Sequence, residues 1–243
     1  MVDIQRIVAP NPGPMTLDGT NTYVLGGEVV VDPGPADAQH VERLVALAPR
    51  LILVTHKHTD HTEAARELAR STGAVLRGLD PDECHGGSPL TDGEWIPVGD
   101  VELQILATPG HTHDSISIVV PGRAVLTGDT ILGRGTTVIM HPDGAIAPYL
   151  ASLDKLEALG DLEVLPGHGD PLPSVAEVAR RYRAHRLERL DQVRAALESL
   201  GVTAAEAKVG DVADLVYVDL DDRVRGAAEA STAAQLSYLA EAG

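Results

Sequence analysis

Phenylalanine is absent from this sequence, and aromatic residues of all kinds make up only 2% of it. Hydrophobic residues still reach 44%, an ordinary share for a soluble globular protein. The core must therefore be built from Val, Leu, Ile and Ala. Proteins that bind single-stranded nucleic acid often stack bases on aromatic rings, and few rings are available here for that purpose.

Basic residues are also scarce. Lys and Arg number 19 against 36 Asp and Glu, which gives a formal net charge of −17. A surface this acidic repels nucleic acid on average. We therefore expect no double-stranded DNA partner, and any binding of RNA would have to use a local basic patch.

The sequence contains a single cysteine, Cys84, which excludes an intramolecular disulfide and fits a reducing compartment. The first residues show no basic segment followed by an apolar one. No run is long and apolar enough to span a membrane. These absences predict a cytoplasmic protein without a membrane partner.

Apolar patterning divides the 243 residues into two parts. Up to about residue 172, short apolar strands alternate with helical segments, which predicts an α/β body. Strands are expected over 28–31, 51–54, 101–107, 116–120, 124–127 and 163–165, and helices over 37–48, 62–71 and 147–159. Residues 174–200 indicate one long helix, and 202–243 look wholly helical. We predict a catalytic domain over 1–172 and a small helical domain over 173–243, with Trp95 in the core.

Three histidines and one aspartate crowd into "HKHTDH", residues 56–61, directly after the strand predicted over 51–54. Neighbouring imidazoles repel one another when protonated and are costly to bury without partners. A loop at a strand end can aim His56 and His58 at one point, and Asp60 and His61 at a neighbouring point. Imidazole nitrogen and carboxylate oxygen are zinc ligands, so the stretch predicts a metal site. The alternative is a coincidental histidine-rich surface loop.

Three further predicted strand ends carry side chains of the same kind. His111 lies in "ATPGHTHDS", Asp129 in "LTGDTI" and His168 in "LPGHGD". Each alone would be read as an ordinary turn residue. Taken in order with residues 56–61, they predict that four loops bring metal-binding side chains to one centre.

This ordered set resembles the metallo-β-lactamase fold superfamily over residues 11 to 172. The resemblance implies an αββα sandwich with two metal ions at one edge of the sheets. It implies that the first ion is held by His56, His58 and His111, the second by Asp60, His61 and His168, and that Asp129 bridges them.

The resemblance also implies a hydrolase with two Zn²⁺ ions, iron or manganese being alternatives. Two metal ions about 3.5–4 Å apart can share a water and lower its pKa from about 15.7 toward ~7. The bridging hydroxide then attacks an acyl carbon or a phosphorus, and the metals stabilise the developing oxyanion. Asp60 would be the catalytic residue, because it can bind a metal and orient the nucleophile.

Three more stretches are similar to the β-lactamase-like protein 2 group, which comprises metal-dependent endoribonucleases and their bacterial relatives. They are "NPGPMTLDGTNTYVLG" at 11–26, "TGDTILGRGTTVI" at 127–139 and "YRAHRLERLDQV" at 182–193. In that group a small winged-helix-like domain follows, a role that residues 174–243 would fill. His113 departs from the group, which often has an acidic residue there, and we expect His113 to face solvent.

Single-stranded RNA is one substrate that fits this resemblance. Residues 180–189 hold five Arg and one Glu, a local charge of +4 that can bind phosphates. Tyr23, Tyr149 and Tyr182 are the only plausible rings for base stacking. The alternative interpretation of the Arg run is a solvated or acid-paired helix face.

A small thioester or ester is the other substrate that fits. Hydroxyacylglutathione hydrolases share the ligand set and an added helical domain, and polyketide-type thioesterases have a similar N-terminal region. The candidate substrate-binding residues are Arg134, Gly135, Thr136, Tyr149 and Arg186. Arg134 could bind a carboxylate or phosphate through two hydrogen bonds. Arg186 could instead pack the C-terminal helices against the body.

Two other classes of function stay open at this point. A mononuclear iron dioxygenase for persulfides keeps the first motif, so an oxidoreductase is an alternative. A catalytically inactive interaction module would require a broken ligand set, and every ligand is present here. Cys84 adds no ligand, because the histidines and aspartates already fill both metal sites. The sequence does not decide between a monomer and a homodimer.

Overall fold

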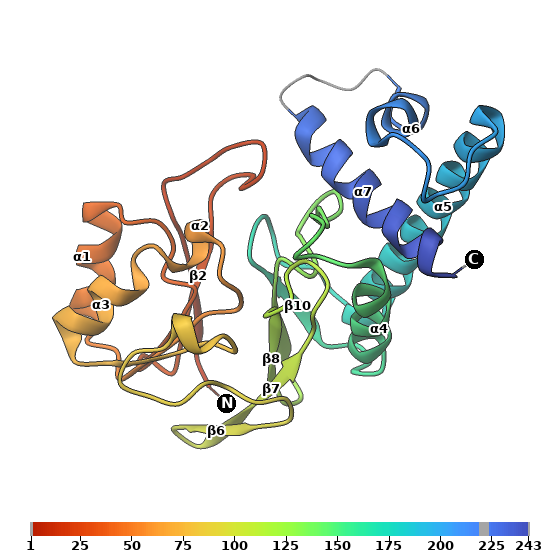
Figure 1. The fold of residues 1–243 in the computed structure, drawn as a ribbon. Helices are drawn as coiled ribbons and strands as arrows, with labels where there is room; N and C mark the ends of the chain where they lie inside the picture. Colours follow the sequence, from red (N-terminus) through yellow and green to blue (C-terminus); the bar gives the residue numbers. More distant parts are fainter. Residues whose placement is uncertain (1, 219–223, 243) are drawn as a thin grey trace.

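The protein is described by a computed structural model that covers residues 2–218 and 224–242. Two five-stranded sheets pack face to face, and helices cover the outer face of each (Figure 1). This αββα order of layers, followed by a C-terminal helical region, confirms the predicted α/β class. None of the helices in the described part of the chain has the length and apolar character needed to cross a membrane.

The first sheet contains the N-terminal strands in chain order: β1 (Ile4–Val8), β2 (Asn21–Leu25), β3 (Val29–Val31), β4 (Leu51–Leu53) and β5 (Val75–Arg77). The first three strands pair antiparallel, whereas β3, β4 and β5 are parallel. Parallel neighbours need a crossover, which α1 (Ala38–Ala46), α2 (Thr59–Thr62) and α3 (Ala65–Thr72) supply. Asp37 begins α1 by accepting a hydrogen bond from the backbone N–H of His40.

The second sheet has the spatial order β10 (Glu163–Pro166), β9 (Ala124–Gly128), β8 (Ile116–Val120), β7 (Val101–Ala107) and β6 (Trp95–Val98). Only β10 and β9 run parallel, and α4 (Ile146–Glu157) connects them. The main core lies between the two sheets and is aliphatic, as expected from the composition. Leu53, Leu103, Ile105 and Ile118 are all fully buried there.

The helical region packs on the outer face of the second sheet. The long helix α5 (Val175–Leu200) lies against α4 and shares a core with it (Figure 1). Two shorter helices follow, α6 (Val209–Val216) and α7 (Arg225–Ala242). The division into two domains at residue 172 stays a prediction.

Two sequence-based expectations fail in this description. Residues 202–208 form a turn rather than helix, which Glu206 closes by accepting a hydrogen bond from the Thr203 hydroxyl. Residues 219–223 of the predicted helical stretch lie outside the described residues. Trp95 is 49% exposed rather than in the core, because β6 is an edge strand that turns Ile96 and Val98 inward and Trp95 outward.

Candidate metal centre

Four loops at one end of the sandwich bring the predicted ligands together. The first follows β4 and carries His56, His58, Asp60 and His61; the others follow β7, β9 and β10 and carry His111, Asp129 and His168. Both sheets contribute, so the side chains meet across the sandwich. The structure therefore brings the side chains at these strand ends together, as expected. The role of each residue as a metal ligand stays a prediction.

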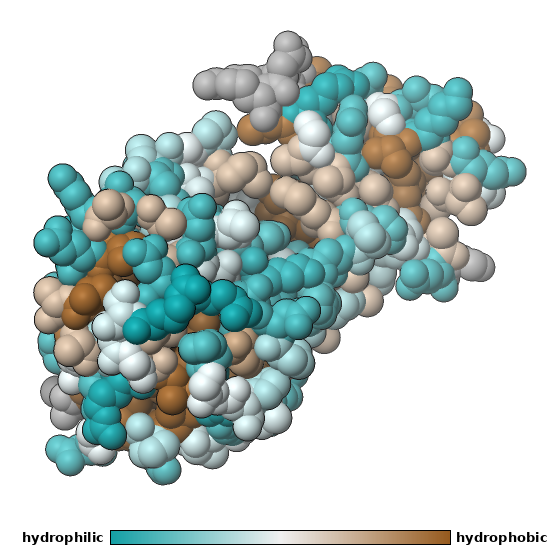
Figure 2. All heavy atoms as spheres, turned by 60° about the vertical axis from the view of Figure 1, so that its left-hand side comes forward, coloured by the Kyte–Doolittle hydropathy of each residue, from teal (hydrophilic) through white to brown (hydrophobic). Residues whose placement is uncertain are grey.

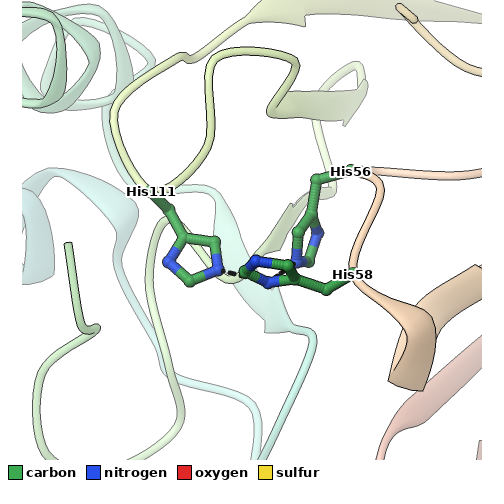
Figure 3. A group of neighbouring side chains, drawn as sticks. All are labelled: His56, His58 and His111. Atoms are coloured by element: carbon green, nitrogen blue, oxygen red, sulfur yellow. Dashed lines mark hydrogen bonds between the residues drawn. The ribbon is translucent and has the colours of Figure 1, made fainter. Parts of the chain in front are cut away.

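Three histidines form the first group, and Figure 3 shows their rings turned toward one another. His58 Nδ1 lies 3.1 Å from His56 Nε2 and 3.0 Å from His111 Nε2. The ring planes are nearly perpendicular, so the nitrogens rather than the ring faces meet. Their ligand atoms lie within 4.8 Å of one another, which suits a single small cation.

A second group combines Asp60, His61 and His168. His61 Nε2 and His168 Nε2 are 3.2 Å apart, and Asp60 Oδ2 lies 3.1 Å from His168 Nε2. Asp129 stands between the two groups. Its Oδ1 is 3.4 Å from His61 Nε2, and its Oδ2 is 3.8 Å from His111 Nε2.

The outer nitrogens of three rings meet acceptors that fix their tautomers. His111 Nδ1 lies 2.7 Å from the carbonyl of Val138, and His168 Nδ1 lies 3.2 Å from the carbonyl of Gly19. His61 Nδ1 lies 2.8 Å from the Asp32 carboxylate. Each of these outer nitrogens must donate, because carbonyls and carboxylates only accept. In the neutral ring, Nε2 then points a lone pair into the centre, as a metal ligand requires.

The donor set fits metal ions in another respect. Asp129 is 9% exposed, and its Oδ1 has no hydrogen-bond partner among the described residues. A buried carboxylate oxygen without a partner is costly unless a cation satisfies it. Nitrogen and carboxylate ligands of this kind suit zinc, iron and manganese alike, so the geometry does not select one metal.

Charges within the centre keep its carboxylates ionised. Burial would raise the pKa of Asp129, but the charges of His61 and His168 outweigh it and hold this pKa well below its ordinary value. Burial would also raise the pKa of Asp60, but the hydrogen bond to His168 and the charge of His61 keep it low. Burial, reinforced by the neighbouring His61 and His111, lowers the pKa of His56, which favours the neutral ring that binds metal.

Sequence reasoning missed Asp32. It directly follows the strand predicted over 28–31, and its buried carboxylate contacts His61 and also accepts hydrogen bonds from the backbone N–H and hydroxyl of Thr55. The Thr55 hydroxyl in turn lies 3.0 Å from His56 Nδ1. Asp32 thus supports two of the candidate ligands from behind. The available signal was only that Asp32, like the candidate ligands, directly follows a predicted strand.

The centre lies at the floor of a pocket of about 540 Å³. His58, Asp60, His111 and Asp129 face this pocket. Its rim includes two exposed methionines, Met15 and Met140, which are 43% and 38% exposed. Lys57 also lines the pocket, and its Nζ lies 2.8 Å from Asp143. His113, 59% exposed at its side chain as expected, also contacts Asp143.

Two of the predicted substrate-binding residues are buried away from this pocket. Tyr149 has no exposed surface, and its hydroxyl donates to the carbonyl of Thr130 at 2.7 Å. The prediction that Tyr149 contacts substrate is therefore wrong, because α4 turns this ring into the core. Arg186 is 4% exposed, donates to the carbonyl of Thr137 and stacks 5.4 Å from the Tyr149 ring centre. Its position matches the alternative packing role and does not face the metal pocket.

The other three substrate candidates lie on the loop after β9, outside the residues that line the metal pocket. Arg134 forms an exposed ion pair with Asp18 at 2.9 Å. Thr136 lies 3.5 Å from His185, and Gly135 has a left-handed backbone with φ of 72° that favours glycine. Their contact with substrate stays a prediction.

The Arg run on α5 is largely engaged within the protein. Arg180 and Arg183 pair with Glu157 and Asp154 of α4. Arg189 stacks 4.6 Å from the Tyr217 ring centre. Tyr23 and Tyr182 are 2% and 1% exposed, so neither is available for stacking bases.

The face of the molecule in Figure 2 is mostly hydrophilic, with hydrophobic residues in separate patches.

Comparison with known proteins places this geometry in a family. The profile described as "Metallo-beta-lactamase superfamily" matches residues 15–168. The Caenorhabditis elegans beta-lactamase-like protein 2 homolog is 32% identical, over 93% of this chain and 80% of its own length. An atrochrysone carboxyl ACP thioesterase of Paecilomyces divaricatus is 31% identical, over 91% of this chain and 74% of its own.

Among solved structures, a metallo-beta-lactamase family protein of Thermus thermophilus superimposes with a TM-score of 0.82. It is 21% identical and covers 99% of this chain and 94% of its own. The likeness covers the C-terminal helices as well as the sandwich, so the whole architecture recurs in that protein.

Proposed function

The chain belongs to the metallo-beta-lactamase superfamily, and on that premise we propose that it hydrolyses acyl thioesters whose acyl group is apolar. The observation that carries this proposal is the pairing of two candidate metal-binding groups on the pocket floor with Met15 and Met140 on its rim. Methionine is flexible and polarisable, so it can accommodate apolar chains of different shapes. A relative named as an acyl-carrier-protein thioesterase supports the same substrate class.

The residues present would hold two metal ions, one in each histidine group, with Asp129 between them. When bound, such ions activate water and stabilise the negative charge that develops on a carbonyl oxygen. Zinc is the proposed metal.

Asp60 is the proposed proton acceptor. It lines the pocket and, because its pKa is held low, it is ionised at neutral pH. The attacking water forms the new C–O bond and gives its proton to this carboxylate. The C–S bond breaks, and the leaving thiolate takes up that proton from Asp60, so the carboxylate is restored and the products are a carboxylic acid and a thiol.

The observations favour this substrate over single-stranded RNA. Stacking on aromatic rings contributes much of the affinity for single strands, and the three tyrosines considered for that role are buried. Arg180 and Arg183, which would contact phosphates, are instead paired with acidic residues of α4.

The test compares zinc-reconstituted wild-type protein with Asp129→Ala in parallel assays. The substrates are thioesters with short and long apolar acyl groups, S-acyl glutathiones and a labelled single-stranded RNA. We expect turnover of the long-chain thioesters that disappears in Asp129→Ala, together with a lower metal content of that variant. Asp154→Ala, which removes an exposed aspartate of α4, serves as the matched control.

RNA cleavage without thioester turnover would overturn the proposed substrate. Oxygen consumption by iron-loaded protein with a persulfide, without hydrolysis, would replace the hydrolase with the oxidoreductase. Wild-type turnover by Asp129→Ala would remove the metal centre from the reaction altogether.

A further inference from the structure

A second, smaller pocket of about 220 Å³ lies behind the metal centre, between the 136–138 segment, α5 and α7. The polar and aromatic residues that line it are Thr136, Thr137, His185, Arg186, Arg189, Tyr217 and Ser231. Within the described part of the chain, no residue lines both this pocket and the metal pocket. His185 and Arg186 belong to the "YRAHRLERLDQV" stretch, which the proposed hydrolysis does not use.

The lining of this pocket is basic in a strongly acidic chain. It contains His185, Arg186 and Arg189, and among the described residues no Asp or Glu lines it. Burial lowers the pKa of His185, and the positive charges of Arg186 and Arg189 lower it further. Arg186 and Arg189 therefore place positive charge in the lining of this pocket, although the protein as a whole carries a formal charge of −17.

Arg186 is the residue that points to a ligand. Its side chain is buried, and one end of the guanidinium donates to the carbonyl of Thr137. Its Nε has no hydrogen-bond partner among the described residues. A buried charged donor without a partner is unfavourable, and an anion in the pocket would supply the missing acceptor.

The neighbouring groups suit the same ligand. Arg189 donates to the side chain of Gln192 and to the carbonyl of Val216. Both acceptors are neutral, so neither of them compensates the positive charge of Arg189. The hydroxyls of Ser231 and Thr136 add donors to the lining. Guanidinium and hydroxyl donors together bind carboxylate and phosphate oxygens.

From this lining, we propose that the cavity between α5, α7 and the 136–138 segment binds a small free oxyanion, a phosphate or a carboxylate, separately from the metal pocket. The site goes beyond the proposed hydrolysis and does not depend on it. It is adjacent to the centre, because Thr137, which accepts from Arg186, also places its hydroxyl 3.1 Å from His111 Nδ1.

Isothermal titration of the full-length, zinc-loaded protein with inorganic phosphate, and separately with acetate, tests the site. The variants are Arg186→Gln, Arg189→Gln and Ala227→Leu, the last of which fills the pocket from α7 without removing a charge. Arg183→Gln is the matched control, since it removes a charge from the same helix outside this pocket. Thermal melting verifies that each variant is folded.

We expect at least one of the two anions to bind the wild-type protein and Arg183→Gln equally, and to bind Arg189→Gln and Ala227→Leu at least tenfold more weakly. An anion that binds at the metal centre would bind there in every variant. The test therefore compares the anion affinities of the variants with that of the wild type. If Arg186→Gln fails to fold, the other two variants decide. Absence of binding by both anions, or equal affinity in every variant, would overturn the proposal.

Discussion

The carboxylate of Asp32 holds the ring of His61 from behind, with Asp32 Oδ2 2.8 Å from His61 Nδ1 and both side chains buried. Burial alone would lower the pKa of His61, but the carboxylates of Asp32 and Asp129 outweigh it and raise this pKa well above its ordinary value. The pair sets the direction of the ring, and in the neutral ring, the form that binds a metal ion, it also sets the tautomer. His61 Nε2 is thereby directed toward His168 and Asp129.

Replacement of Asp32 by Asn should therefore weaken the second metal group without removing a ligand. An amide at this position cannot accept as strongly from His61 Nδ1, so the ring loses its fixed orientation. We expect metal affinity about 10–100-fold weaker, measured by competition with a chromogenic chelator. Asp37→Asn, which alters a helix-capping aspartate outside the centre, should bind metal as the wild type does. Equal affinities for the two variants would contradict a supporting role for Asp32.

Gly167 offers a test that leaves every candidate ligand in place. A Cβ at this position would lie 2.5 Å from Asp129 Oδ1 and 2.8 Å from His61 Cε1. Gly167→Ala must therefore displace both side chains, and we expect it to lose most of its metal and at least about a hundredfold of its turnover. Gly210→Ala has nothing within 4 Å of the added carbon and should retain both. Full metal content in Gly167→Ala would show that metal binding does not require Asp129 and His61 to approach position 167 this closely.

The two exposed methionines predict a preference for apolar acyl groups. Met140→Gln keeps the size of the side chain but makes it polar, so KM for a long-chain thioester should rise about tenfold while an acetyl thioester is little affected. Leu215→Gln changes an exposed apolar residue of α6 outside the pocket and serves as control. An unchanged chain-length profile would remove Met140 from substrate recognition.

A salt bridge outside the candidate metal groups gives a prediction about stability and pH. Arg77 and Glu94 are 2.7 Å apart and partly buried. Burial would raise the pKa of Glu94, but the hydrogen bond and charge of Arg77 outweigh it, so the pKa lies below the ordinary 4.5. The pair therefore stabilises the fold above about pH 4.5, and this contribution is lost as the pH falls through the lowered pKa.

Glu94→Gln should accordingly unfold more easily than the wild type at pH 7, by about 1–3 kcal/mol in urea titrations. The difference should shrink steadily below pH 4.5. Glu102→Gln, at an exposed position of β7, should show little difference at either pH. If the difference in unfolding free energy between Glu94→Gln and the wild type persists at low pH, it does not come from the charge of Glu94.

Local chemistry in the sequence was sufficient to predict much of the centre. The candidate ligands follow strands, and the strand ends of both sheets meet at one end of the sandwich. The spacing of His56, His58 and His61 could be read directly, because these residues are neighbours in the chain. Asp32 could not be recognised in this way, because its contact with His61 depends on how β3 and β4 pair.

Side-chain direction in the C-terminal half was harder to predict. Tyr149 and Arg186 carry polar groups and lie within about 20 positions of His168 in the sequence. The packing of α4 on α5 nevertheless buries both side chains. Close approach contributes to this: a Cβ on Gly110 would lie 2.4 Å from Tyr149 Cα, so α4 can sit this near only beside a glycine. Such contacts depend on the tertiary arrangement and leave no periodic pattern.

The spread of the centre along the chain has a consequence for how the protein is made. His61 and His168 stand 107 positions apart, and the two sheets must dock before their rings can meet. During synthesis the loop after β4 emerges long before the loop after β10 exists. A nascent chain therefore exposes a cluster of histidines that can hold a metal ion only in part. The proposed metal loading would therefore be complete only after translation has passed residue 168, as a late step of maturation.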